Sequence, residues 1–300
     1  SEVLAPMLSE LSPGLQQQSL ETMLVYPDPI FTGYVDALIF PSQEPSILAL
    51  AMRYVWLTQT DADVSQLKPY LRPSIAPVVR GTAASMMLKR GRPGERAQAT
   101  YILQQMLIHP EERERVMGCR ALGEADYMQG LRLHVPNLLQ DDSLRVRRSM
   151  LDAIAATRLE EHYPSLLEAL RYKSTREAAM QALVALGDDA LPMLMQVAGN
   201  PYKPDTLRHQ AWQVIGRIGT LQALTLLASN LMTSWGEPRR WILRILLKLS
   251  DEQGLRRSAD IDIALDGLGR QSVETLLNQE LQFIGQLYSG LIDCGADKAP

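Results

Sequence analysis

The residues that could do acid–base, nucleophilic or metal chemistry are few in this chain of 300 residues, and they do not cluster. The histidines are His109, His134, His162 and His209, and the cysteines are Cys119 and Cys294. No HExxH motif, no Cys/His pair at metal-ligand spacing and no GxxxxGK phosphate loop occurs. We therefore predict that the chain is not an enzyme and has no catalytic residue, metal site or cofactor.

A recurring arginine is the strongest pattern in the sequence. Positions +3, +4, +6 and +7 after it are mostly apolar, as in Met150, Leu151, Ala153 and Ile154 after Arg147. This spacing gives a helix one apolar face. The arginines, called register arginines below, are Arg80, Arg115, Arg147, Arg176, Arg208 and Arg239, at steps of 35, 32, 29, 32 and 31 residues. A unit close to 31 residues long therefore repeats along the chain.

Each unit is predicted to be a helical hairpin. In residues 136–157 an apolar segment, a polar turn and a second apolar helix follow one another. Such a hairpin buries its apolar faces only against copies of itself, so the units should stack. We expect the register arginines to be structural and to join turn acids in a partial ladder. The candidate pairs are Asp142 with Arg147, Asp205 with Arg208, and Glu237 with Arg239.

Three stretches carry the repeat most clearly: LLQDDSLRVRRSMLDAIA (138–155), TREAAMQALVALGDDALPML (175–194) and LRHQAWQVIGRIG (207–219). They resemble the HEAT repeat, and its short HEAT-like form first described in phycobilin lyases. The resemblance implies an all-α fold: a right-handed α-solenoid, armadillo-like, of about six to eight hairpins with helical caps at both ends.

Three segments follow from where the repeat is present. Residues 1–60 are predicted to be an N-terminal helical cap, because prolines break them into short helices and the repeat is absent. Residues 61–250 hold the HEAT-like repeats. Residues 251–300 are predicted to be a C-terminal cap with one long amphipathic helix over 271–291.

Composition and charge limit the functional class and the cellular compartment of the protein. Thirty Lys and Arg against 34 Asp and Glu give a net charge of −4, which argues against a general nucleic-acid binder. Two cysteines favour a reducing compartment, so a cytoplasmic protein is expected. The chain starts with Ser1 and ends in a polar tail, which suggests a piece of a longer protein. In that case this segment is the soluble domain, and only another part of the full-length protein would contact a membrane.

The second helices of such a fold present a polar face at positions +1, +5 and +9 from the register arginine, where solenoids bind partners. Residues 201–250 carry seven Lys and Arg against two Asp and Glu, and 251–300 carry four against nine. The face is either a solvated surface balanced by the acidic C-terminal segment, or a docking site for an acidic peptide, another domain or anionic headgroups. The predicted binding strip is Arg148, Asp152, His209, Gln213, Arg217, Arg240, Arg244 and Lys248.

The first functional hypothesis is a non-catalytic protein–protein interaction scaffold whose partner is a protein or an adjacent domain of acidic character. Residues 186–224 also resemble HEAT segments of bacterial ADP/ATP-translocase-like membrane proteins, which implies a cytosolic regulatory module. A third class is an enzyme: a phycobilin-lyase-like subunit or a HEAT-like DNA glycosylase. A glycosylase needs an acid beside aromatic residues, and only Asp152 lies centrally on the predicted strip.

Overall fold

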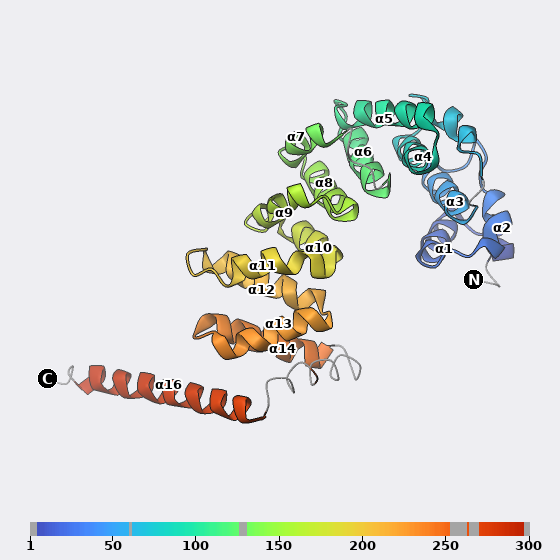
Figure 1. Cartoon of the computed structure of the whole chain (residues 1–300). Coiled ribbons are helices and arrows are strands. Elements are labelled where there is room, and N and C mark those ends of the chain that lie inside the picture. The colour runs from blue at the N-terminus through green and yellow to red at the C-terminus, as the bar shows by residue number, and fades with distance from the viewer. Residues whose placement is uncertain (1–4, 60–61, 126–130, 253–262, 264–269, 297–300) are drawn as a thin grey trace. The chain divides into compact units, whose positions relative to one another are not determined.

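A computed structural model of the chain describes residues 5–59, 62–125, 131–252, 263 and 270–296 (Figure 1). Every regular element within these ranges is an α-helix or a 3₁₀ helix. The predicted all-α fold is therefore confirmed. Parts of the predicted C-terminal cap, residues 253–262, 264–269 and 297–300, lie outside the described residues.

Contacts divide the chain into two compact units, Ser1–Ala182 and Leu183–Pro300. The first holds η1 (Ala5–Glu10), α1 (Pro13–Val25), η2 (Pro29–Phe31), α2 (Thr32–Asp36), α3 (Pro45–Thr58), η3 (Val64–Leu71), α4 (Pro77–Arg90), α5 (Pro93–Leu107), α6 (Glu112–Ala125), η4 (Arg132–His134), α7 (Val135–Leu139), α8 (Leu144–Thr157), η5 (Glu160–His162) and α9 (Tyr163–Ala169). The boundary falls within α10 (Arg176–Leu186). The second unit holds η6 (Gly187–Ala190), α11 (Leu191–Ala198), α12 (Asp205–Ile218), α13 (Leu221–Thr233), α14 (Glu237–Glu252) and α16 (Arg270–Ala296).

The second helix of a hairpin is well specified by its sequence, and α8 shows how. The hydroxyl of Ser143 accepts hydrogen bonds from the first free backbone N–H groups of the helix and so caps its N-terminus. Val146, Met150 and Ile154 recur at a spacing of four and are completely buried, which fixes the face that points inward. The helix ends where Arg158 adopts a left-handed backbone, with a φ of 50°.

Within each unit the second helices pack against one another in chain order. In the first unit α4 packs on α6 and α6 on α8; in the second unit α12 packs on α14. The helices α1 and α3, from the segment predicted as an N-terminal cap, continue the series because α1 packs on α3 and α3 on α4. Figure 1 shows this succession of paired helices.

The first helices of the hairpins are less regular than the second ones. The element over Val64–Leu71 is a 3₁₀ helix with Pro69 inside it, since proline cannot donate the hydrogen bond that an α-helix needs there. In the third hairpin the α-helix begins only at Val135, with Pro136 in its first turn, where proline is tolerated.

The long C-terminal helix is present as α16, and its described outer part is exposed. All residues from 281 to 290 are exposed to solvent. Among them are large apolar side chains: Leu281, Phe283, Ile284, Leu287 and Tyr288 are between 46% and 68% exposed. Over these residues the apolar row therefore faces solvent.

One stretch of the described residues, Arg176–Ala198, has the length and apolar composition of a membrane span, with a mean hydropathy of 1.2 and 44% of the window buried. It is divided into α10, η6 and α11. The break lies at Gly187, which has a φ of 63°, a backbone conformation that glycine adopts without steric cost. The buried side chains of the stretch Arg176–Ala198, among them Leu183 and Leu194, belong to the core of the repeats.

Candidate binding site

The register arginines hold the two helices of a hairpin together. At the end of a helix the last carbonyl groups have no partner within the helix. Five register arginines donate to carbonyl oxygens at or just after the end of the first helix: Arg80 to Pro73 and Ile75, Arg115 to His109 and Pro110, Arg176 to Leu170, Arg208 to Ala198, and Arg239 to Leu231 and Met232. The recurrence of arginine at this position thus has a structural cause.

Acids join neighbouring hairpins in the first unit, but not those that the sequence suggested. Arg115 donates to both carboxylate oxygens of Asp141, at 2.7 and 3.0 Å, and Arg80 pairs with Glu114. The expected pairing of Asp142 with Arg147 is wrong, because the neighbouring Asp141 turns toward Arg115 while Asp142 is exposed. Burial raises the pKa of Asp141, but hydrogen bonds from Arg115 and from a backbone N–H outweigh it and keep this pKa below its ordinary value.

In the second unit the two turn acids bind arginines of their own helix, and only one of the two expected pairs forms. Arg208 binds Asp205 at 2.9 Å, three residues earlier. Glu237 binds Arg240 at 2.7 Å, which corrects the expected pairing with Arg239. Arg239 is completely buried and binds Glu280 on α16 instead, at 2.7 Å.

The second-unit part of the predicted binding strip lies on α12 and α14, which pack side by side. Four cations, Arg217, Arg240, Arg244 and Lys248, are exposed there. The last three follow each other at intervals of four residues, so they share one face of α14. The structure thus brings four exposed positive charges onto adjacent helices.

Two polar residues beside these cations are half-buried. The His209 ring lies 5.1 Å from the Trp241 ring, and its Nε2 lies 3.3 Å from the amide nitrogen of Gln213. Burial, and next the charge of Arg244, lower the pKa of His209. At neutral pH this histidine is therefore an uncharged hydrogen-bonding group and adds no positive charge to the strip.

The remaining two predicted strip residues lie in the first unit, on α8. Arg148 donates to the carbonyl oxygen of Ser174, at 2.7 and 3.0 Å, so it ties α8 to the turn before α10. Asp152 is exposed, yet surrounding protein atoms raise its pKa and Arg120 only partly offsets this.

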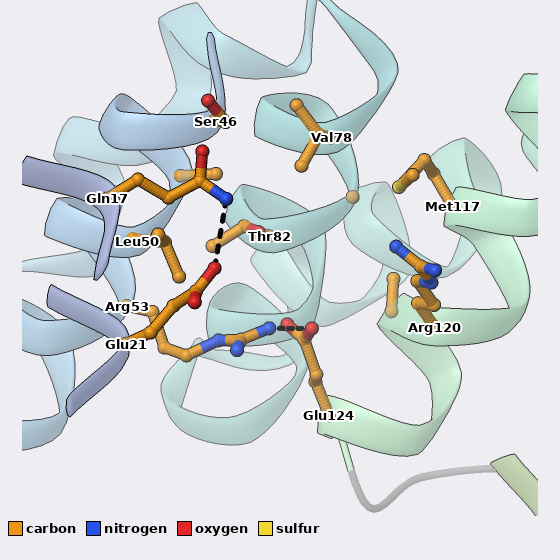
Figure 2. Close-up of a pocket in the computed structure, with 13 residues that line it drawn as sticks. Gln17, Glu21, Ser46, Leu50, Arg53, Val78, Thr82, Met117, Arg120 and Glu124 are labelled. Carbon is orange, nitrogen blue, oxygen red and sulfur yellow. Dashed lines mark hydrogen bonds and ion pairs between the residues drawn. The ribbon is translucent and has the colours of Figure 1, made fainter. Parts of the chain in front are cut away.

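The first unit also has a pocket of about 230 Å³ on the second-helix side, lined by α1, α3, α4 and α6 (Figure 2). Arg53 from α3 pairs with Glu124 from α6 across it, and Gln17 donates to Glu21 on α1 at 2.9 Å. Burial, and then the like charge of Arg120, lower the pKa of Arg53. Figure 2 shows Arg120 beside this pair; the side chain of Arg120 makes no hydrogen bond or ion pair with any residue that the structure describes.

Sequence reasoning missed Arg53 in this pocket, because α3 lies outside the repeat register. The sequence did indicate the residues on the opposite wall of the pocket, because Arg120 and Glu124 occupy positions +5 and +9 after Arg115. The lining residues include two arginines and two glutamates but no histidine or cysteine. Such a balanced set of charges can recognise a polar ligand, and it lacks a nucleophile paired with a base.

Elsewhere the described residues contain no group of three or more His, Cys, Asp or Glu arranged to hold a metal ion. Cys119 is completely buried, and burial raises the pKa of its thiol to about 12. A thiol of this kind is not a reactive nucleophile, because the thiolate is the reactive form.

Comparison with known proteins identifies the repeat. The family described as PBS lyase HEAT-like repeat matches residues 175–200. These residues are a HEAT-like repeat. They span α10 to α11, the second helix of one hairpin and the first of the next. The resemblance inferred from the sequence is thereby confirmed for this stretch, which lies within a series of paired helices.

Solved structures with similar helices are distant. The complex of CpcE and CpcF of phycocyanin lyase from Nostoc sp. PCC7120 is 18% identical, with a TM-score of 0.38; the match covers 79% of this chain and 94% of that chain. An engineered protein is 14% identical, with a TM-score of 0.38, and the match covers 72% and 98%. No curated protein matches the sequence.

Proposed function

We propose that this HEAT-like repeat protein is a non-catalytic binding module that holds an acidic segment of a partner protein on the second-helix strip of its second unit. This strip is His209, Gln213, Arg217, Arg240, Arg244 and Lys248. The observation that carries the proposal is the row of exposed cations on α14 beside the exposed Arg217 of α12.

The four cations of the strip are exposed, whereas the register arginines of the same helices are half-buried or buried; Arg240 also binds Glu237 of its own helix. Arg208 and Arg239 direct their donors at backbone carbonyls and at an acid of their own unit. The strip residues themselves include four Lys and Arg and no Asp or Glu. Side chains on a rigid helix at i, i+4 spacing offer donors at regular intervals, which suits carboxylates along an extended or helical segment.

The proposal is tested by selecting binders from a library of random displayed peptides on the purified chain. We expect the selected peptides to be enriched in Asp and Glu. Their affinity should fall by at least about tenfold for the double variant Arg244→Glu, Lys248→Glu, since charge reversal at two contacts removes attraction and adds repulsion.

The control variant is Arg113→Glu, Lys173→Glu, which reverses two exposed cations of the first unit and changes the net charge equally. It should bind the peptides as the unmodified chain does. Peptides without acidic enrichment, or equal losses in both double variants, would refute the strip as the contact surface.

The description of the matched repeat supports a second candidate, a bilin lyase-like subunit. Incubation of the chain with phycocyanobilin and an apo-phycobiliprotein would test it by the absorbance of the covalent adduct. No adduct, alone or with a second helical-repeat subunit, would remove this candidate.

We also propose that the module works in the cytoplasm, either by itself or as the soluble part of a membrane protein. The buried free thiol of Cys119 supports a reducing compartment. Fractionation of cells that express the full reading frame tests this, and an extracytoplasmic location would contradict it.

A further inference from the structure

The side chain of one register arginine, Arg147, lacks the hydrogen bonds that the other five make. The side chain of Arg147 donates no hydrogen bond to any residue that the structure describes, although the side chains of the five other register arginines each bind a carbonyl of their hairpin. Its Nε is buried and has no hydrogen-bond partner among these residues. A buried donor without a partner is unfavourable unless something else accepts its hydrogen bond.

The local structure explains why Arg147 is left over. The nearby turn acid, Asp141, accepts two hydrogen bonds from Arg115 of the preceding hairpin and a third from the backbone N–H of Ser143. The first helix of this hairpin, α7, is also short and ends at Leu139.

Arg147 lines a pocket of about 480 Å³ in the first unit. It is formed by α7, α8, α9 and the turn before α10, and it is lined by Pro136, Leu139, Gln140, Arg147, Leu151, His162, Ser165, Glu168, Ala169, Tyr172, Ser174 and Thr175. A second buried nitrogen of this lining, Nε2 of His162, also has no hydrogen-bond partner among the described residues; its nearest acid is Glu161, at 3.6 Å.

The lining limits the charge and shape of a ligand. Arg147 is its one Lys or Arg, and its one acid, Glu168, is engaged by Arg171 at 2.9 and 3.1 Å. One cation beside one acid favours a ligand with a single negative charge over a dianion. The apolar walls of Pro136, Leu139 and Leu151 favour an apolar body, and the volume is within the usual range for small-molecule pockets.

We propose that this pocket binds a small organic monocarboxylate, with the guanidinium of Arg147 on its carboxylate and the apolar body against α7 and α8. A planar carboxylate matches the guanidinium fork better than a spherical anion does. The site is separate from the second-helix strip, and either proposal can fail without the other.

Calorimetric titration with three probes tests this inference: 3-phenylpropionate, its neutral amide 3-phenylpropanamide, and inorganic phosphate. We expect the carboxylate to bind at least about tenfold more tightly than the amide, because a charge-assisted hydrogen bond is lost in the amide. Phosphate should bind more weakly than the carboxylate. Equal affinities for acid and amide, stronger phosphate binding, or no carboxylate binding at millimolar concentration would each overturn the proposal.

Variants then locate the site. Arg147→Met should weaken 3-phenylpropionate by at least about tenfold, while Arg145→Met, which changes an exposed arginine on the same helix, should not. Ser165→Trp should block binding from the α9 side without altering Arg147. Should Arg147→Met fail to fold, Ser165→Trp decides alone, and unchanged affinity in that variant overturns the assignment.

Discussion

Single side chains at the register position carry much of the polar structure of the chain. The guanidinium of Arg115 meets two carbonyls of its own hairpin and the carboxylate of Asp141 in the next. An aliphatic residue could fill the same space but could not satisfy these oxygens. Arginine at this position therefore joins five of the six hairpins internally, and Arg80 and Arg115 also join their hairpins to the next one.

Replacing Asp141 should destabilise the fold in a way that depends on pH. Asp141→Asn should lower the free energy of unfolding by about 2 kcal/mol at pH 7, because a partly buried charged pair is broken. The pKa of Asp141 is lowered by folding, so its contribution is present above the unfolded pKa of about 4 and is lost as the pH falls through the folded value. Urea denaturation across this pH range measures the effect.

The adjacent Asp142 is the matched control for this substitution. It is exposed, so Asp142→Asn should change stability by less than about 0.5 kcal/mol at any pH. An equal loss in both variants would contradict the assignment of the inter-hairpin contact to Asp141.

The buried thiol gives a second prediction at the residue scale. In a Cys294→Ser variant the remaining Cys119 should not react with Ellman's reagent at pH 8, because a pKa of about 12 leaves about 10⁻⁴ of it as thiolate and the side chain is completely buried. Full reaction should follow denaturation in guanidinium. Rapid labelling of the native protein would contradict the packing of α6.

At the scale of elements, the close approach of α12 and α14 depends on a residue without a side chain. A Cβ added at Gly216 would overlap a methyl group of Ile245. Gly216→Ala should therefore lower stability by about 2 kcal/mol through overpacking. In an Ile245→Ala background the same change should cost less, and thermal unfolding of the four proteins gives this coupling.

A substitution at another helical glycine serves as the control that separates overpacking from helix propensity. Gly285 in α16 has no atom within 4 Å of an added Cβ. Gly285→Ala should leave stability unchanged or raise it by up to about 1 kcal/mol, because alanine favours helix. A loss at Gly285 as large as at Gly216 would show that overpacking is not the cause.

At the scale of the whole molecule, a chain of repeats should respond to damage locally. In such proteins each hairpin is stabilised chiefly by its neighbours. Hydrogen exchange of the Gly216→Ala variant should therefore rise most in α12 and α14 and stay unchanged in α4 and α6 of the first unit. Equal acceleration throughout the chain would instead indicate one cooperative core.

The sequence was sufficient for the repeat and insufficient for its contacts. Apolar residues at fixed distances from each register arginine predicted second helices such as α6 and α8 correctly, because burial of one helix face is a local pattern. The choice between Asp141 and Asp142 depends on the direction of a turn, which no spacing encodes. The pocket at Arg53 and Glu124 joins residues far apart in sequence, and the unpartnered Arg147 is visible only once the neighbouring pairs are known.

The exposed row on α16 has a consequence for the behaviour of the purified chain. Leu281, Ile284 and Leu287 are each more than half exposed, so burial offsets little of the unfavourable hydration of these side chains. We expect these three side chains to affect the solubility of the protein more than its free energy of unfolding. Glutamine at all three positions should raise the ammonium sulfate concentration needed for precipitation and leave the urea midpoint where it was.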